Sequence, residues 1–190
     1  MILHHNRDIH NRVDDSVIQV CNDQPCLIRR SRGYVPEPFF ADMDMEGLLA
    51  FGAEKVNTFA LSKADTVVQS QYIGDLKNWE TFMFYREALD RFRHLFRFTP
   101  KMLVCDLHPD YLSSREAVEI AGKESLPLLK VQHHHAHAAA CMLEYGLHEP
   151  VIAIVWDGVG LGADGKVWGG EFFLCDRKAY TRLSHLEYVP

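Results

Sequence analysis

The sequence predicts an α/β fold built around a mixed sheet. Short apolar runs with tight connections between residues 47 and 69 are typical of a strand meander. From residue 78 onward, helical patterns alternate with strand patterns, which favours parallel strands joined by helices. The unbroken apolar run at residues 151–156 is typical of a strand buried on both faces.

Composition and charge narrow the class of protein. The 190 residues carry a net charge of −6, from 20 basic and 26 acidic residues, which disfavours a broad nucleic-acid-binding face. The polar start lacks the apolar run of a signal peptide, and no stretch approaches the roughly 20 apolar residues of a membrane span. Five cysteines without a C-x-x-C pair predict reduced, mostly buried thiols, Cys141 among them. We therefore expect a cytoplasmic protein with no membrane or nucleic-acid partner.

The first forty residues predict the end of a preceding domain. Residues 16–21 alternate apolar and polar side chains, and residues 25–30 form a second strand pattern after a short turn. A lone hairpin of this kind is only marginally stable in water. Gly33, Pro36 and Pro38 then interrupt regular structure, so we expect a linker and a domain boundary here.

The remaining chain supplies the elements of the sheet and its helices. Apolar side chains repeat at spacings of three and four before Pro100, which predicts a helix with one apolar face. Gly122 and Gly146 are typical of helix ends, and Asp164-Gly165 favours a two-residue hairpin turn. The residues of that apolar face are Phe82, Tyr85, Leu89, Phe92, Leu95 and Phe96. The expected strands are 48–52, 58–61, 66–69, 102–105, 127–131, 151–156 and 166–175, and the expected helices are 78–98, 113–122 and 134–146.

A histidine cluster opens the last of these helices. His133 and His137 are four residues apart, so on a helix they share one face and their imidazoles can reach one metal ion. Neutral imidazole suits zinc or ferrous iron, and a third ligand, a carboxylate, must come from elsewhere. His134 and His135 point in other directions, toward phosphate or solvent. The alternative is a polar helix start that binds no metal.

A glycine-rich segment follows the buried strand at residues 151–156. Asp157 is placed at the end of that strand, where it can bind a metal ion or orient a water molecule. Gly158 and Gly160 can let backbone N–H groups approach a phosphate, and the pair Gly169-Gly170 can let the returning strand approach the same ligand. A tight turn without a ligand is the alternative. His108 lies in a loop after a strand end, which either lines a ligand cleft or is a turn stabilised by its neighbours.

Several longer motifs resemble the HypF carbamoyltransferase family. They are spread over nearly the whole chain and lie at residues 5–7 with 12–17, 29–34, 70–76, 105–113, 131–137, 157–160 and 168–171. The resemblance implies that residues 1–38 are the end of a YrdC-like domain, 39–45 a linker, and 46–190 a truncated first lobe of a Kae1-like domain. That lobe has the actin/sugar-kinase type of nucleotide-binding fold.

The resemblance also implies an activity. Members of this family use carbamoyl phosphate and ATP to make carbamoyl-adenylate, and they pass the carbamoyl group to the C-terminal cysteine of a HypE partner in [NiFe] hydrogenase maturation. His133 and His137 match the family's metal ligands, for zinc or iron, while magnesium accompanies the nucleotide. Asp157, Gly158 and Gly160 match the loop beside the metal and the phosphates. The nucleophile is the partner's thiolate, so no catalytic residue is assigned in this chain.

Two departures from the family pattern stand out. Lys55 lies one place earlier than the family's lysine, a shift that in a strand would turn it to the other face. The second lobe, with the family's other aspartate ligand, and most of the YrdC-like domain are missing, so we expect this chain alone to be inactive. The alternatives are a tRNA threonylcarbamoyl-transferase of the related TsaD family, or a noncatalytic truncated fragment.

Overall fold

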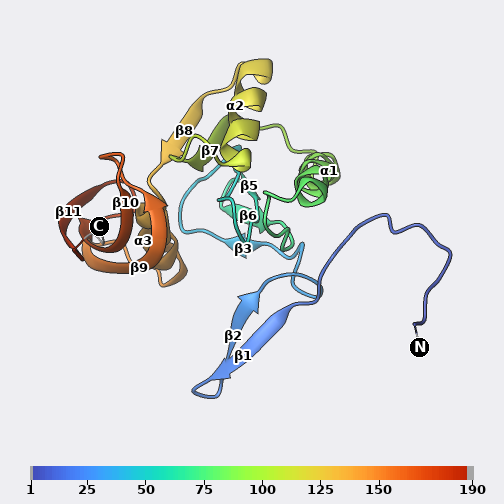
Figure 1. Ribbon diagram of the computed structural model, residues 1–190, viewed down its shortest axis with the longest axis horizontal. Helices are drawn as coiled ribbons and strands as arrows, with labels where there is room; N and C mark the ends of the chain where they lie inside the picture. The colour runs from blue at the N-terminus through green and yellow to red at the C-terminus, as the bar shows by residue number, and fades with distance from the viewer. Residues whose placement is uncertain (1, 188–190) are drawn as a thin grey trace.

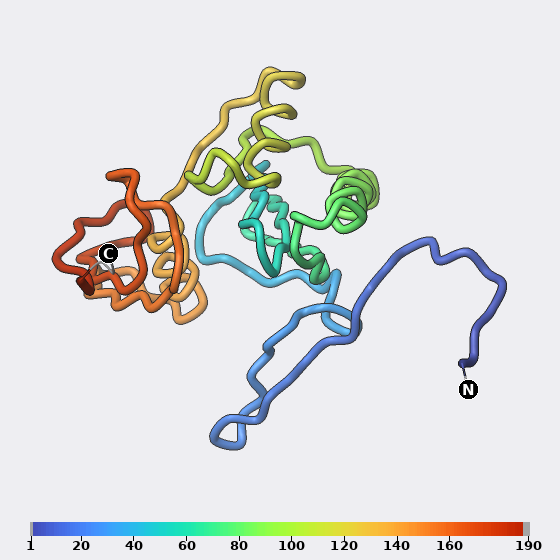
Figure 2. The backbone as a smooth tube through the Cα atoms, in the orientation of Figure 1, coloured from blue at the N-terminus to red at the C-terminus, as the bar shows by residue number. Residues whose placement is uncertain are grey.

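The computed structural model describes residues 2–187 and divides them into three parts. Figures 1 and 2 show an extended N-terminal arm leading to a hairpin, then a central sheet with two helices, then a smaller sheet with one helix. The predicted α/β fold with a mixed sheet is confirmed.

The N-terminal hairpin pairs β1 (Val17–Cys21) with β2 (Gln24–Arg29) in an antiparallel two-stranded sheet. Its side chains are almost all exposed, as expected for a hairpin without a covering layer. The Arg29 guanidinium lies 4.5 Å from the centre of the Tyr72 ring, and this contact joins the hairpin to the central part.

The central sheet has six strands in the order β3-β6-β5-β4-β7-β8. The strands β3, β6, β5 and β4 pair antiparallel, whereas β4, β7 and β8 pair parallel, which makes the sheet mixed. Part of the expected linker belongs to this sheet, because β3 pairs with β6 at one edge. The strand bounds are β3 (Phe39–Phe40), β4 (Leu48–Ala50), β5 (Ala60–Lys63), β6 (Thr66–Gln69), β7 (Met102–Asp106) and β8 (Leu128–Val131).

Helices α1 (Trp79–Leu95) and α2 (Leu112–Glu124) contribute to one hydrophobic core with the central sheet. Asn78 caps α1 by accepting a hydrogen bond from the Thr81 N–H. The predicted apolar face of α1 is confirmed except at Leu95, which is exposed. Within residues 2–187, no helix is long and apolar enough to cross a membrane.

The third part packs α3 (His133–Glu144) against a three-stranded antiparallel sheet of order β11-β10-β9. The strands are β9 (Val151–Leu161), β10 (Val167–Cys175) and β11 (Tyr180–His185). The expected burial of β9 on both faces is wrong. Ile152, Ile154 and Trp156 are exposed, since among the described residues α3 covers only the other face of this sheet.

Strand β9 also continues through the glycine-rich segment, so Asp157 lies within the strand and not at its end. The pairing register shifts there, because Trp168 pairs with Gly160 while Gly170 pairs with Trp156. Three residues of β9 therefore face one residue of β10, which is a β-bulge. The hairpin turn is longer than predicted, since residues 162–166 connect the two strands.

The expectation of mostly buried cysteines is also wrong. Only Cys105 and Cys175 are buried, while Cys21, Cys26 and Cys141 are exposed. Cys141 lies on α3 next to the buried Met142, but on the side of the helix that faces solvent.

Candidate functional site

The N-terminus of α3 brings the two predicted metal ligands together. Gln132 caps the helix, and its side-chain oxygen accepts a hydrogen bond of 2.8 Å from the His135 N–H. The helix therefore starts at His133, and His137 follows one turn later on the same face. Their Nε2 atoms are 3.2 Å apart, with ring centres separated by 4.8 Å.

Asp157 completes this cluster from β9. Its Oδ2 lies 3.0 Å from the His133 Nε2 and 3.8 Å from the His137 Nε2. The bulge in β9 turns this carboxylate toward α3, which is a common use of bulges beside functional sites. The three ligand atoms all lie within 4.8 Å of one another.

These residues fit a divalent transition metal. The Asp157 Oδ2 is buried and accepts no hydrogen bond from the described residues, although it faces two ring nitrogens. A buried carboxylate oxygen that accepts no hydrogen bond is costly, and a cation between it and the two rings would remove that cost. Two imidazoles and one carboxylate suit zinc or ferrous iron, and these three ligands leave room for a further ligand on the metal.

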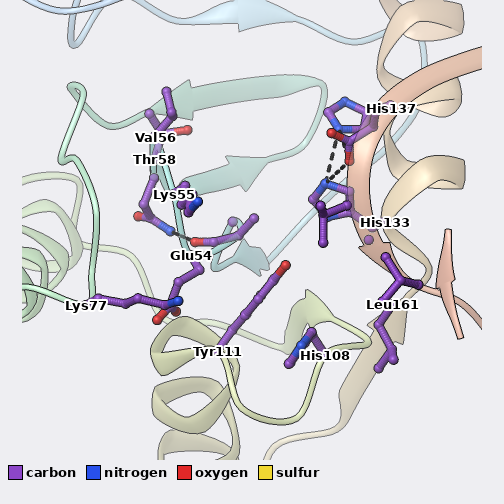
Figure 3. Close-up of a pocket in the computed structure, with 17 residues that line it drawn as sticks. Glu54, Lys55, Val56, Thr58, Lys77, His108, Tyr111, His133, His137 and Leu161 are labelled. Carbon is purple, nitrogen blue, oxygen red and sulfur yellow. Dashed lines mark hydrogen bonds and ion pairs between the residues drawn. The ribbon is translucent and has the colours of Figure 1, made fainter. Parts of the chain in front are cut away.

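The cluster lies on one wall of a cavity of about 710 Å³. Figure 3 shows His133 and His137 on this wall, with a loop carrying Glu54 and Lys55 on the opposite side. Asp157 and Gly160 also line the cavity, whereas the other glycines predicted to bind cofactor do not. Those three glycines are Gly158, Gly169 and Gly170.

The structure gives Gly160 a packing role. A Cβ atom at this position would lie 2.5 Å from the His134 Cε1, so only glycine lets β9 approach α3 this closely. His134 is fully buried at this contact, contrary to the expectation that it faces phosphate or solvent. Its burial lowers the pKa of its imidazole, so the ring stays neutral.

The remaining predicted glycines lie around the bulge. Gly158 is exposed, and no atom lies within 4 Å of where its Cβ would be. Gly169 lies opposite the bulge, where a Cβ would make ordinary contacts with the carbonyl oxygens of Gly158 and Asp157. Gly170 instead packs against Trp156 and Leu186, away from the histidine cluster.

The opposite wall is a loop at residues 52–58, held against the start of α2. The buried Glu54 accepts a hydrogen bond of 2.7 Å from the Leu112 N–H and so caps that helix. The loop is not a strand, and Val56 has a φ of 51°, so the expected turn of Lys55 to another face does not apply. Lys55 and Lys77 both line the cavity and give this wall positive charge.

Sequence reasoning missed two polar residues of the site. The buried Asp106 ends β7, and its Oδ2 lies 2.6 Å from the His133 Nδ1. This contact is the largest cause of the raised pKa of His133. The sequence could have pointed to Asp106, because adjacent parallel strands end at the same edge of a sheet. Residues at the ends of β7 and β8 therefore meet there.

Tyr111 is the second missed residue. It stacks on His108 with ring centres 4.2 Å apart, and both residues line the cavity. Figure 3 shows its hydroxyl pointing into the cavity between the two walls. Partial burial raises the pKa of Tyr111, so the hydroxyl keeps its proton and can donate a hydrogen bond.

Comparison with known proteins gives two family matches along the chain. The HypF Kae1-like domain matches residues 43–144, and the second subdomain of the carbamoyltransferase Kae1-like domain matches residues 153–190. The histidines of α3 therefore come from the first match and Asp157 from the second. The candidate metal site joins the two subdomains.

Curated relatives and solved structures agree with these matches. The chain is 41% identical over 185 residues to carbamoyltransferase HypF of Synechocystis sp., covering 96% of this chain and 24% of that protein. It is 41% identical over 190 residues to HypF2 of Cupriavidus necator, covering 98% of this chain and 23% of that protein.

Among solved structures, full-length HypF in its phosphate- and nucleotide-bound form superposes with a TM-score of 0.90 at 43% identity. That superposition covers 98% of this chain and 29% of the other. HypF of T. kodakarensis gives a TM-score of 0.84 at 41% identity, with 94% of this chain and 23% of the other covered. The chain thus spans about a quarter of the length of the relatives it matches. The family models, the sequence identities and the superpositions together show that this chain belongs to the HypF carbamoyltransferase family, of which it carries Kae1-like sequence.

Proposed function

We propose that this chain supplies part of the transfer site of a carbamoyltransferase that acts in [NiFe] hydrogenase maturation. The whole enzyme would use carbamoyl phosphate and ATP to form carbamoyl-adenylate. It would then transfer the carbamoyl group to the C-terminal cysteine of a HypE-like protein. In that transfer the thiolate sulfur forms a bond to the carbamoyl carbon, the bond from that carbon to the AMP oxygen breaks, and AMP leaves.

One observation carries this proposal. Within the described residues, the Nε2 atoms of His133 and His137 and a carboxylate oxygen of Asp157 converge on the wall of a large cavity. These three ligands face the cavity, where the family's other aspartate ligand and the substrate would complete the coordination of the metal. Membership of the HypF family supports carbamoyl transfer as the reaction class.

Each wall of the cavity has a proposed task. Zinc or iron held by His133, His137 and Asp157 would act as a Lewis acid that polarises an oxygen of the bound substrate. Lys55 and Lys77, on the opposite wall, would attract the phosphates of ATP with their magnesium ion. The Tyr111 hydroxyl can donate a hydrogen bond to a substrate oxygen between the walls. The nucleotide bound to a related HypF supports a nucleotide in this cavity.

The domain assignment accompanies this proposal. Residues 46–190 would form Kae1-like structure around the transfer site, and residues 1–38 would belong to the YrdC-like domain in which the adenylate forms. The isolated hairpin of β1 and β2 supports this division, since it packs little against the central sheet.

Metal binding by the full chain tests the proposal. The metal-free protein is titrated with Zn²⁺ in competition with a chromophoric chelator, alongside His133→Ala, His137→Ala and Asp157→Asn variants. Each variant removes one of three ligands, so we expect one bound zinc in the parent chain and a loss of at least tenfold in affinity in each variant.

The matched control is His135→Ala. His135 lies on the same helix, but its Nε2 is 2.9 Å from the Asp176 carbonyl oxygen and its ring contacts Tyr180. This variant should bind zinc as the parent does. Equal affinity in all four variants and the parent would disprove the ligand assignment, and transfer of threonylcarbamoyl to tRNA by the complete enzyme would disprove the assigned reaction.

A further inference from the structure

Asp106 contacts His133 on the side of the ring opposite the cavity. The Asp106 Oδ2 lies 2.6 Å from the His133 Nδ1, while the His133 Nε2 faces Asp157 and His137. The side chain of Asp106 is only 7% exposed, so this contact is shielded from water. Two carboxylates therefore flank one imidazole, one on each nitrogen.

We propose that Asp106 is a positioning residue that keeps the proton of neutral His133 on Nδ1 and so leaves the Nε2 lone pair for the metal. This inference rests on the proposed metal site. A metal-ligating histidine usually donates its second N–H to a carboxylate or carbonyl oxygen, which fixes the ring and its tautomer. Asp106 supplies that acceptor here.

The carboxylate of Asp106 is itself held in place. Its Oδ1 accepts a hydrogen bond of 2.8 Å from the His108 N–H, and the Ser114 hydroxyl donates to its backbone carbonyl at 3.2 Å. With one oxygen engaged by the backbone, only the other remains for His133. Asp106 thus links the strand end, the following loop and the ring in one fixed arrangement.

Asparagine at position 106 would disturb this arrangement without changing its size. A carboxamide has one acceptor oxygen, but the His108 N–H and the His133 Nδ1–H both require an acceptor. If the oxygen stays on His108, the amide N–H points at the His133 Nδ1 and forces the ring proton to Nε2. That proton would then face Asp157, and it would block the metal position.

Two measurements on the full chain test this role. Proton–nitrogen NMR of the metal-free protein at alkaline pH, where the rings are neutral, reports which nitrogen of His133 carries the proton. Chelator competition with Zn²⁺ reports affinity. We expect Asp106→Asn to move the proton toward Nε2 and to weaken zinc binding about 10- to 100-fold, the usual effect of losing such a partner.

The matched control is Asp110→Asn in the same loop. Asp110 is 71% exposed and pairs with Arg115, so this variant should keep the parent's tautomer and affinity. An Asp106→Asn protein that melts like the parent and keeps both properties would overturn the proposal. If the parent binds no zinc, the metal site fails, but the NMR result still decides whether Asp106 sets the tautomer.

Discussion

Replacing Gly160 by alanine tests how closely α3 and β9 must approach to form the site. The added Cβ would lie 2.5 Å from the His134 Cε1, where ordinary contacts fall between 3.4 and 4 Å. One of the two groups must therefore move by about 1 Å, more than well-packed interiors absorb without cost. His134 cannot move outward easily, because it is fully buried and its Nδ1 is 3.1 Å from the Gln132 amide nitrogen.

The expected cost of Gly160→Ala is about 2 kcal/mol in the free energy of unfolding, within the range of about 1–3 kcal/mol for overpacked cores. Gly158→Ala is the matched control two residues away in the same strand. Its Cβ would meet nothing within 4 Å, and neither glycine has a positive φ. Removing glycine from a strand should then stabilise the control by up to about 1 kcal/mol.

Urea unfolding of the full chain, followed by circular dichroism, measures both variants against the parent. The change in unfolding free energy should differ between Gly160→Ala and Gly158→Ala by about 2–3 kcal/mol. Equal midpoints for the two variants would refute the close approach of β9 and α3. The position of Asp157 relative to the histidines would then also be wrong.

Two further predictions concern the central part. Asn78→Ala removes the side-chain oxygen that accepts the Thr81 N–H, so it should lower the unfolding free energy by about 1 kcal/mol, and an unchanged urea midpoint would contradict the cap. Burial raises the pKa of Glu116, while Arg86 at 3.0 Å opposes that shift. The folded chain holds this proton more tightly than the unfolded chain. The stability that the protonated Glu116 contributes to the parent is therefore lost as the pH rises from the ordinary glutamate pKa of 4.5 through the folded pKa. Glu116→Gln should therefore gain stability relative to the parent between pH 4 and pH 7, and a difference that does not change with pH would exclude this burial effect.

Local patterns were enough to predict most elements of the fold. The apolar spacing of α1, the glycine Gly146 after α3 and the apolar run at residues 151–156 of β9 each act over a few neighbouring residues. Gly122 does not end its helix as predicted, because α2 continues to Glu124 and Ser125 adopts the left-handed conformation after it. The same holds for the pair of histidines, because a spacing of four residues on a helix fixes which side chains share a face.

The burial of β9 and its pairing register depend on elements that are distant in the sequence. Residues 151–156 have the composition of a doubly buried strand, but their exposure is set by what covers the sheet, and in the described chain only α3 does so. Strand β9 continues beyond Trp156 because the backbone of β10 pairs with the glycine-rich segment. Nothing in the local sequence predicts which strand a glycine-rich segment will pair with.

The sequence by itself determined the fold class, the helix that carries His133 and His137, and the family motifs. Only the tertiary structure decided that Asp157 and Asp106 approach opposite nitrogens of the His133 ring. The physical reason is that these carboxylates lie 24 and 27 residues away from His133, on strands whose neighbours and bulge are set by long-range pairing. Helical spacing is enough to align the two imidazole rings. The carboxylates beside them are placed only when the strands that carry Asp106 and Asp157 have paired.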